Sequence, residues 1–200
     1  MNEVDSIFKK TQGAAEFSVK YFEYLNKVLL SINPEEIQHF SNLLLQARET
    51  GNKIIFMGNG GSAATASHFA NDISIGTRSK TKPFRAISIT DNNAVITAIA
   101  NDDGFDEIFT QQLQVILSPG DLVVAISASG NSPSVLNAIN YANENDAITI
   151  GITAFDGGKL KNSSKYSIHV PTNPKEYGPA EDAHMILDHL IGAYLSRVIL

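Results

Sequence analysis

Apolar and polar residues follow one another in blocks that predict an all-helical start and then an alternation of strands and helices. Between residues 6 and 31, apolar side chains recur at spacings near three and four, as on one face of a helix. A second helix is predicted to begin at Asn33-Pro34, with asparagine as cap and proline in the first turn, and to end before Gly51. Residues 1–50 are therefore predicted to form a pair of N-terminal helices.

Beyond this pair, short apolar runs predict strands, and segments of helical character lie between most of them. The run from Asp121 to Ser127 is almost continuously apolar, which is typical of a central parallel strand with both faces buried. The pattern predicts an α/β fold with a parallel sheet flanked by helices. The predicted strands are residues 53–57, 84–89, 121–127, 147–152 and 166–170, and the predicted helices are residues 61–75, 92–101, 106–117, 133–144 and 180–199.

Length and composition narrow the class of protein. The chain has 200 residues, which suits one domain, residues 1–200, with residues 51–200 as sheet core and C-terminal helix. Its net charge of -6 argues against nucleic acid as a partner. The acidic start lacks the apolar segment of a signal peptide, and no apolar run is long enough to predict a membrane span. The absence of cysteine is compatible with a reducing compartment, and we expect a cytoplasmic protein.

A glycine-rich turn follows the first predicted strand and leads into a helix. Its residues, Gly58-Asn59-Gly60-Gly61-Ser62, can present backbone N–H groups and a hydroxyl at a helix N-terminus, where the helix dipole favours an anion such as phosphate. The lysine of a P-loop is missing. A dinucleotide site remains an alternative at this point, because the spacing fits a loose form of that fingerprint with alanine at position 63.

A second turn, rich in hydroxyls, follows the central strand. Ser127, Ser129, Ser132 and Ser134 surround Gly130 in this segment, and Ser132 precedes a proline as an N-terminal cap would. Capping explains Ser132 but leaves Ser127 and Ser129 unexplained. Ligands of parallel sheets bind beyond the carboxyl ends of the strands. The two turns therefore predict a phosphate site built from neutral donors.

These two turns resemble those of the SIS (sugar isomerase) domain, and further segments resemble the phosphoheptose isomerase branch, over about residues 15 to 195. The matching segments are GNGGSA, SASGNS, HFANDIS, AIANDDGFDEIF, GITAFDGGKL and EDAHMILDH. The resemblance implies a three-layer, flavodoxin-like fold with a five-stranded parallel sheet, a homotetramer, and isomerisation of sedoheptulose 7-phosphate to glycero-manno-heptose 7-phosphate without a nucleotide cofactor, in heptose biosynthesis for lipopolysaccharide or capsule. The substrate- and phosphate-binding residues that it implies are Asn59, Gly61, Ser62, Asp102, Ser127, Ser129, Ser132 and Glu181.

The resemblance also implies a catalytic pair. Asp72 stands where the family has its base, and His189 stands where the family has the histidine partner. Such an isomerisation moves a proton between C1 and C2 through an enediol, and it needs an acid or a metal at the oxygens. Some family members bind zinc at four positions, which implies a divalent metal, with Zn²⁺ favoured, held by His68, Asp72, Glu181 and His189.

The chain departs from the family pattern where the sugar would lie. Asp72 replaces a glutamate, Glu181 replaces a glutamine, Ala128 replaces a threonine, and Gly178-Pro179 replaces Asp-Arg. Two alternatives therefore stay open beside the heptose reaction. One is an isomerase for another sugar phosphate. The other is a non-catalytic SIS protein that binds a sugar phosphate or a protein partner, although a pure binder would not need the carboxylates and histidines.

Overall fold

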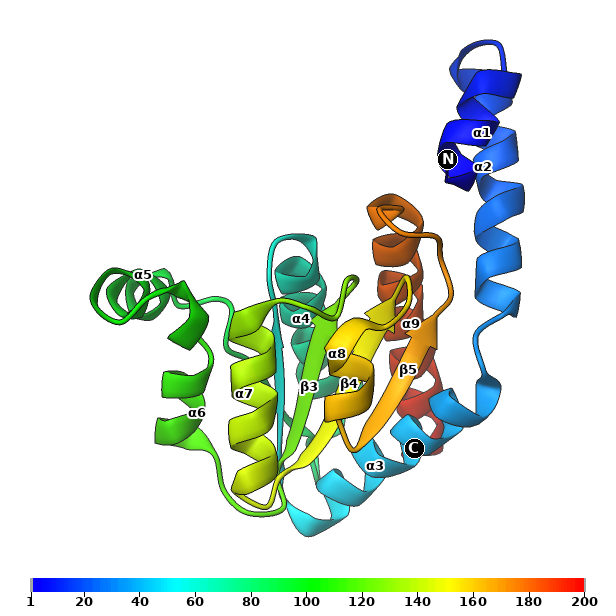
Figure 1. Cartoon of the computed structure of the whole chain (residues 1–200). Helices are drawn as coiled ribbons and strands as arrows, with labels where there is room; N and C mark the ends of the chain where they lie inside the picture. The colour runs from blue at the N-terminus through cyan, green and yellow to red at the C-terminus, as the bar shows by residue number, and fades with distance from the viewer. Residues whose placement is uncertain (1, 200) are drawn as a thin grey trace.

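Five parallel strands form the centre of the molecule, in the order β2-β1-β3-β4-β5. Of these, β3, β4 and β5 are labelled in Figure 1. The structure is a computed structural model and describes residues 2–199. The five-stranded parallel sheet confirms the fold predicted from the sequence. The strands are β1 (Lys53–Gly58), β2 (Arg85–Ser88), β3 (Leu122–Ser127), β4 (Ile148–Ala154) and β5 (Tyr166–Val170).

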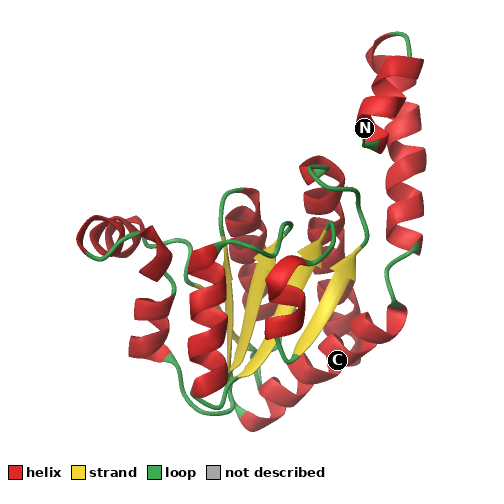
Figure 2. Ribbon diagram, in the orientation of Figure 1, coloured by secondary structure: helices red, strands yellow, loops and turns green. Residues whose placement is uncertain are grey.

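Helices cover both faces of the sheet and make a three-layer arrangement (Figure 2). One face packs against α3, α4 and α9, and the other packs against α6, α7 and α8. The helices are α1 (Glu3–Lys10), α2 (Gly13–Leu30), α3 (Pro34–Thr50), α4 (Gly61–Asn71), α5 (Asn93–Asp102), α6 (Thr110–Ile116), α7 (Pro133–Glu144), α8 (Gly158–Ser163) and α9 (Tyr177–Val198).

The alternation of side chains along β1 shows how the two faces are built. Ile54 and Phe56 are buried in the layer with α4 and α9, whereas Ile55 and Met57 are buried in the layer with α7. Successive side chains of a strand point to opposite faces, so a strand between two helical layers must be apolar throughout. This requirement explains the continuous apolar runs that predicted the central strands.

The N-terminal region differs from the predicted pair of helices. The stretch from residue 6 to residue 31 is interrupted, because Thr11 is extended and its hydroxyl donates to the carbonyl of Ile7 at 3.0 Å. Three helices therefore precede β1. The hairpin of α1 and α2 projects from the body (Figure 1). It is anchored by the buried carboxylate of Glu176, which accepts hydrogen bonds from the backbone N–H of Glu3 and from the Tyr24 hydroxyl.

Other differences are local. The predicted helix 61–75 is α4 continued by a π-helical turn, Asp72–Gly76, and the predicted helix 106–117 begins with a separate 3₁₀ turn before α6. The helix α8 was not predicted, because six residues are too short to show a helical period. Within residues 2–199, the helices are all too short or too polar to cross a membrane.

Candidate active site

Two glycine- and serine-rich turns meet where the strand order reverses at the middle of the sheet. β1 and β3 are neighbours, and Gly58 lies opposite Ile126 at their carboxyl ends. The chain leaves β1 into α4 and leaves β3 into α7. Those two helices cover opposite faces of the sheet, so a crevice opens between their N-termini.

The first turn depends on glycine for its close packing. A Cβ at Gly58 would lie 2.7 Å from the carbonyl oxygen of Ser62 and 2.9 Å from that of Ile126. Gly60 has φ +57 and occupies the N-cap position of α4. The amide of Asn59 donates to the hydroxyl of Ser134 at 2.9 Å and so joins the first turn to α7.

The second turn is braced by the first turn of α8. Gly130 has φ +62, and its backbone N–H donates to the Ser127 hydroxyl oxygen at 3.2 Å. Its carbonyl accepts from the backbone N–H of Leu160 at 2.9 Å. Ser132 caps α7 without a side-chain hydrogen bond, so its hydroxyl is available to a ligand.

Together the turns line a cavity of about 280 Å³, which we call the serine cradle. None of the described residues that line it is a lysine or an arginine. Its polar groups are hydroxyls, an amide, two helix N-termini and one carboxylate, so neutral dipoles are available to an anion. The lining residues are Asn59, Gly60, Gly61, Ser62, Ile126, Ser127, Ala128, Ser129, Ser132, Tyr177 and Glu181.

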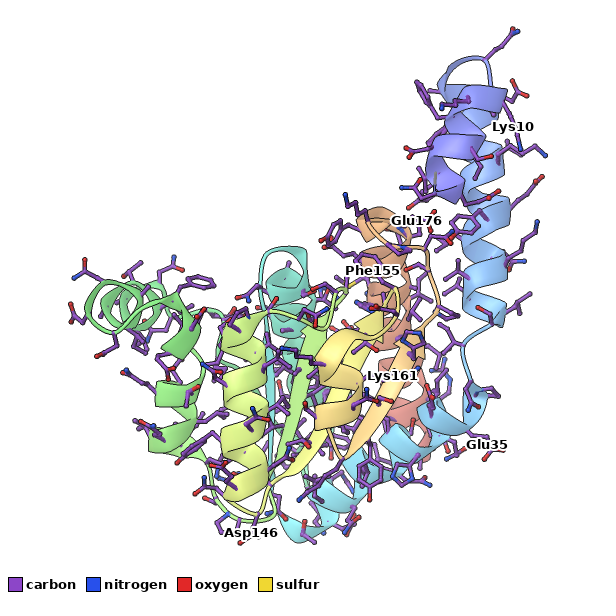
Figure 3. The ribbon with its side chains drawn as sticks, viewed as in Figure 1. Lys10, Glu35, Asp146, Phe155, Lys161 and Glu176 are labelled. Carbon is purple, nitrogen blue, oxygen red and sulfur yellow. The ribbon has the colours of Figure 1, made fainter. Side chains whose placement is uncertain are left out.

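The carboxylate of the cradle belongs to Glu181, in the first turns of α9. A Cβ at Gly61 would lie 2.2 Å from Glu181 Oε2, so this carboxylate lies directly on the first residue of α4. A helix N-terminus attracts a carboxylate as it attracts phosphate. Beside it, Tyr177 packs against Phe155 with ring centroids 5.1 Å apart. Figure 3 labels Phe155 and, near it, Glu176, the residue before Tyr177.

A second group of polar side chains lies farther along α4, where α9 crosses it. His68, Asp72, Asp188 and His189 place their ligand atoms within 4.8 Å of one another, and we call them the carboxylate–histidine cluster. His68 Nε2 lies 3.2 Å from His189 Nε2, 3.5 Å from Asp72 Oδ2 and 3.9 Å from Asp188 Oδ2. The i, i+4 spacing of His68 and Asp72 puts both on the face of α4 that meets α9.

Asp188 is the unusual member of this cluster. Its side chain is fully buried, and neither carboxylate oxygen has a hydrogen-bond partner among the described residues. Burial, with a smaller contribution from the nearby charge of Asp72, raises the pKa of Asp188 to about 8. A buried carboxylate without partners is costly, so the position calls for a proton or a cation.

The structure divides the residues singled out in the sequence between these two groups. His68, Asp72 and His189 lie in the cluster, whereas Glu181 lies in the cradle. Asp102 lies at the exposed end of α5 and belongs to neither group. Sequence reasoning missed Asp188 and Tyr177; a charged residue among the apolar positions of α9 was the available signal for Asp188. The residues placed in the cradle are Asn59, Gly61, Ser62, Ser127, Ser129, Ser132 and Glu181.

His184, four residues before Asp188, is turned into the core. It is 1% exposed, and its Nε2 lies 3.4 Å from the carbonyl oxygen of Thr153, to which it can donate. Burial lowers the pKa of His184 to about 4. The imidazole is therefore neutral in the folded protein at neutral pH, and its Nδ1 has no hydrogen-bond partner within residues 2–199.

This burial predicts that acid destabilises the protein through His184. Below pH 6.5 the imidazole of His184 is protonated in the unfolded chain, whereas in the folded protein it stays neutral down to about pH 4. The free energy of unfolding therefore falls as the pH falls from 6.5 to about 4. The loss is up to about 3 kcal/mol. Urea unfolding of the protein and of His184→Gln between pH 7 and pH 4 measures it. His184→Gln should show a smaller slope of unfolding free energy against pH than the unmodified protein. The control His39→Gln removes an exposed imidazole and should keep the slope of the unmodified protein. Equal slopes for all three proteins would contradict the assignment.

Comparison with known proteins identifies a domain family and relatives within it. Residues 20–154 match the SIS domain family. The phosphoheptose isomerase of Aliarcobacter butzleri is 35% identical over 84% of this chain and 88% of its own length. The probable phosphoheptose isomerase of Thermoplasma acidophilum is 36% identical over 89% of this chain and 97% of its own. The solved structure of phosphoheptose isomerase from Neisseria gonorrhoeae superimposes with a TM-score of 0.81 and 29% identity, covering 92% of this chain and 98% of that one.

Proposed function

Since the chain belongs to the SIS-domain phosphoheptose isomerases, we propose that it is an aldose–ketose isomerase that converts sedoheptulose 7-phosphate to glycero-manno-heptose 7-phosphate. The proposal assigns substrate phosphate to the serine cradle and the reacting carbons to the carboxylate–histidine cluster. Both sites include residues of α4: Gly61 and Ser62 line the cradle, and His68 belongs to the cluster.

The observation that carries this proposal is the separation of the two sites. Gly61, at the cradle, and His68, in the cluster, are seven residues apart on α4, which corresponds to about 10 Å along the helix. An extended chain advances about 1.2 Å per bond, and about seven bonds separate C2 of a heptulose from the phosphorus of its 7-phosphate, roughly 8 Å. A seven-carbon sugar phosphate can therefore reach both sites, whereas a triose phosphate is too short.

In the cradle, the phosphate would accept hydrogen bonds from donors that already face the cavity. The hydroxyls of Ser62, Ser127, Ser129 and Ser132 and the N-termini of α4 and α7 are the donors. This chain has Ala128 where the family pattern has threonine, and that difference leaves these serines in place. Glu181 lies at the same helix end, so we propose that it accepts hydrogen bonds from sugar hydroxyls rather than from phosphate.

At the cluster, the proposed chemistry is a proton transfer between C1 and C2. Asp72 removes the C1 proton of the ketose, the enediol forms, and the same carboxyl group returns a proton to C2. His189 Nε2, 3.2 Å from His68 Nε2, donates a proton to the C2 oxygen as the enediol forms, and then takes the proton of the C1 hydroxyl as the C1 carbonyl forms. Both oxygens are then uncharged, as in the aldose product, and His189 regains its proton. Asp102, the exposed last residue of α5, belongs to neither site and has no part in this scheme.

The cluster also fits a divalent metal. His68, Asp72 and His189 are ligand types that Zn²⁺ accepts, and the unpartnered carboxylate of Asp188 supplies the negative charge that a buried cation needs. When bound, Zn²⁺ would polarise the oxygens at C1 and C2 as a Lewis acid. We propose Zn²⁺ for this position.

Isotope exchange tests the function directly. The purified protein, incubated with sedoheptulose 7-phosphate in D₂O, should form heptose 7-phosphate with deuterium at C2, because Asp72 exchanges its proton with solvent before returning it. NMR of the product measures both outcomes. A five-carbon ketose phosphate is the matched control, and we expect its turnover to be at least about 10²-fold slower because it spans the two sites poorly.

Absence of product and of exchange, with phosphate still bound, would reject the isomerase. That result would favour a non-catalytic protein that binds sugar phosphates. Turnover of the five-carbon substrate at the heptulose rate would instead reject the assignment of chain length.

The proposed setting is a cytoplasmic homotetramer. Exposed apolar side chains on the projecting hairpin, Phe8, Val19, Phe22 and Leu30, support association of copies through α1 and α2. The absence of cysteine is compatible with a reducing compartment.

A further inference from the structure

Asp188 lies where the metal site of this chain requires one more ligand. His68, Asp72 and His189 supply three ligand groups, and the fourth group expected from the sequence, Glu181, is absent from the cluster. Glu181 precedes His189 by eight residues on α9, about 12 Å along the helix. Its carboxylate lies instead on Gly61 at the start of α4.

The distances around His68 match a metal centre. Four ligands about 2.1 Å from a tetrahedral Zn²⁺ lie about 3.4 Å from one another. His68 Nε2 lies 3.2 Å from His189 Nε2, 3.5 Å from Asp72 Oδ2 and 3.9 Å from Asp188 Oδ2. All four ligand atoms lie within 4.8 Å of one another, so they can close around an ion by drawing together by at most about 1.4 Å.

The burial of Asp188 is an independent observation that points the same way. Both of its oxygens are buried without a hydrogen-bond partner in the part of the chain that the structure describes. Buried carboxylates are normally paired with donors or coordinate metals, because desolvation of the charge is otherwise uncompensated. The neighbouring acidic group, Asp72, cannot compensate it, and the nearest imidazole, His68, is 3.9 Å away.

We propose that Asp188, and not Glu181, is the fourth ligand of a divalent metal site formed by His68, Asp72, Asp188 and His189. All four ligands come from α4, the π-helical turn that continues it and α9 of one chain, so a single subunit can bind the ion. Glu181 is thereby left to the serine cradle. The assignment deepens the proposed function, on which it rests for the chemical role of the ion, but metal binding can be measured without any substrate.

Metal titration separates the two carboxylates. Chelator-treated protein is titrated with Zn²⁺ against a chromogenic chelator, for the unmodified chain, Asp188→Asn, Glu181→Gln and Asp106→Asn, the last being an exposed aspartate remote from the site. We expect one ion per chain, an affinity at least about 10-fold lower for Asp188→Asn, and affinities within about twofold of the unmodified chain for the other two. Weak binding by Glu181→Gln with normal binding by Asp188→Asn would overturn the proposal, as would failure of the unmodified chain to bind Zn²⁺.

A cysteine substitution provides a spectroscopic test that does not depend on loss of binding. The chain has no cysteine, so Asp188→Cys introduces its single thiol. With Co²⁺ in place of Zn²⁺, a thiolate ligand produces a sulfur-to-cobalt charge-transfer band. We expect this band for Asp188→Cys and not for Glu181→Cys. The reverse pattern would overturn the assignment, and because turnover is not measured, failure of the isomerase proposal would leave this result intact.

Discussion

Asp72→Asn should lower kcat for sedoheptulose 7-phosphate by about 10³-fold or more and abolish deuterium exchange, because an amide cannot accept the C1 proton. The substitution keeps the shape of the side chain, and Asp72 is partly exposed at the junction of α4 with the π-helical turn. We therefore expect little change in the free energy of unfolding. Steady-state kinetics and product NMR measure the loss, and KM should change far less than kcat.

The matched variant Asp106→Asn makes the same chemical change at an exposed aspartate far from the cluster, and its kcat should equal that of the unmodified protein. Metal content must be measured in parallel, since Asp72 also belongs to the proposed ligand set. If Asp72→Asn retained its metal and its turnover, Asp72 would not be the base.

Asp72→Glu examines the departure from the family pattern. The side chain lies against α9, where a Cβ at Gly192 would come within 3.8 Å of Asp72 Cβ. One more methylene moves the carboxylate by more than an ångström, and a misplacement of about 1 Å can reduce a rate by about 10²-fold. We expect such a loss in kcat. Faster turnover by Asp72→Glu would show that the shorter side chain is not fitted to this site.

Gly130→Ala should be the most damaging single substitution in the cradle. A Cβ at this position would lie 2.1 Å from the carbonyl oxygen of Gly157, a backbone atom that cannot rotate away, and φ is +62. The left-handed conformation costs roughly 1–2 kcal/mol for a residue with a Cβ. Overpacking typically adds about 1–3 kcal/mol, so we expect the free energy of unfolding to fall by about 2–5 kcal/mol. Chemical denaturation measures it, and binding of inorganic phosphate should be lost at the same time.

Two controls separate the causes of this loss. Gly51→Ala places a Cβ at φ +75 with no atom within 4 Å, so it reports the cost of the backbone conformation alone, roughly 1–2 kcal/mol. Ser129→Ala removes a predicted phosphate donor. It should weaken phosphate binding by roughly 10-fold while stability changes by less than about 1 kcal/mol. If Gly130→Ala were no worse than Gly51→Ala, the close approach of the two loops would not be important for the cradle.

Most of the fold was predictable because its signals are local. Apolar runs such as 121–127 and helix starts such as Asn33-Pro34 depend on the residues within one element, and these elements appear in the structure as β3 and α3. The break at Thr11 was not predictable from periodicity, since apolar residues continue on both sides of it. The serine cradle was predictable for a different reason: both turns follow adjacent central strands, so the parallel sheet brings them to one edge.

The second site depended on how α4 and α9 cross, which no spacing within the sequence encodes. The i, i+4 pair His68 and Asp72 was evident from one helix, but the partner from α9 depended on the rotation of that helix in the core. The crossing buries Asp188 beside His68 and turns Glu181 toward Gly61, about two helical turns away. Local pattern thus sufficed for the elements and for the two turns of the cradle, whereas long-range packing determined which carboxylate faces the two histidines.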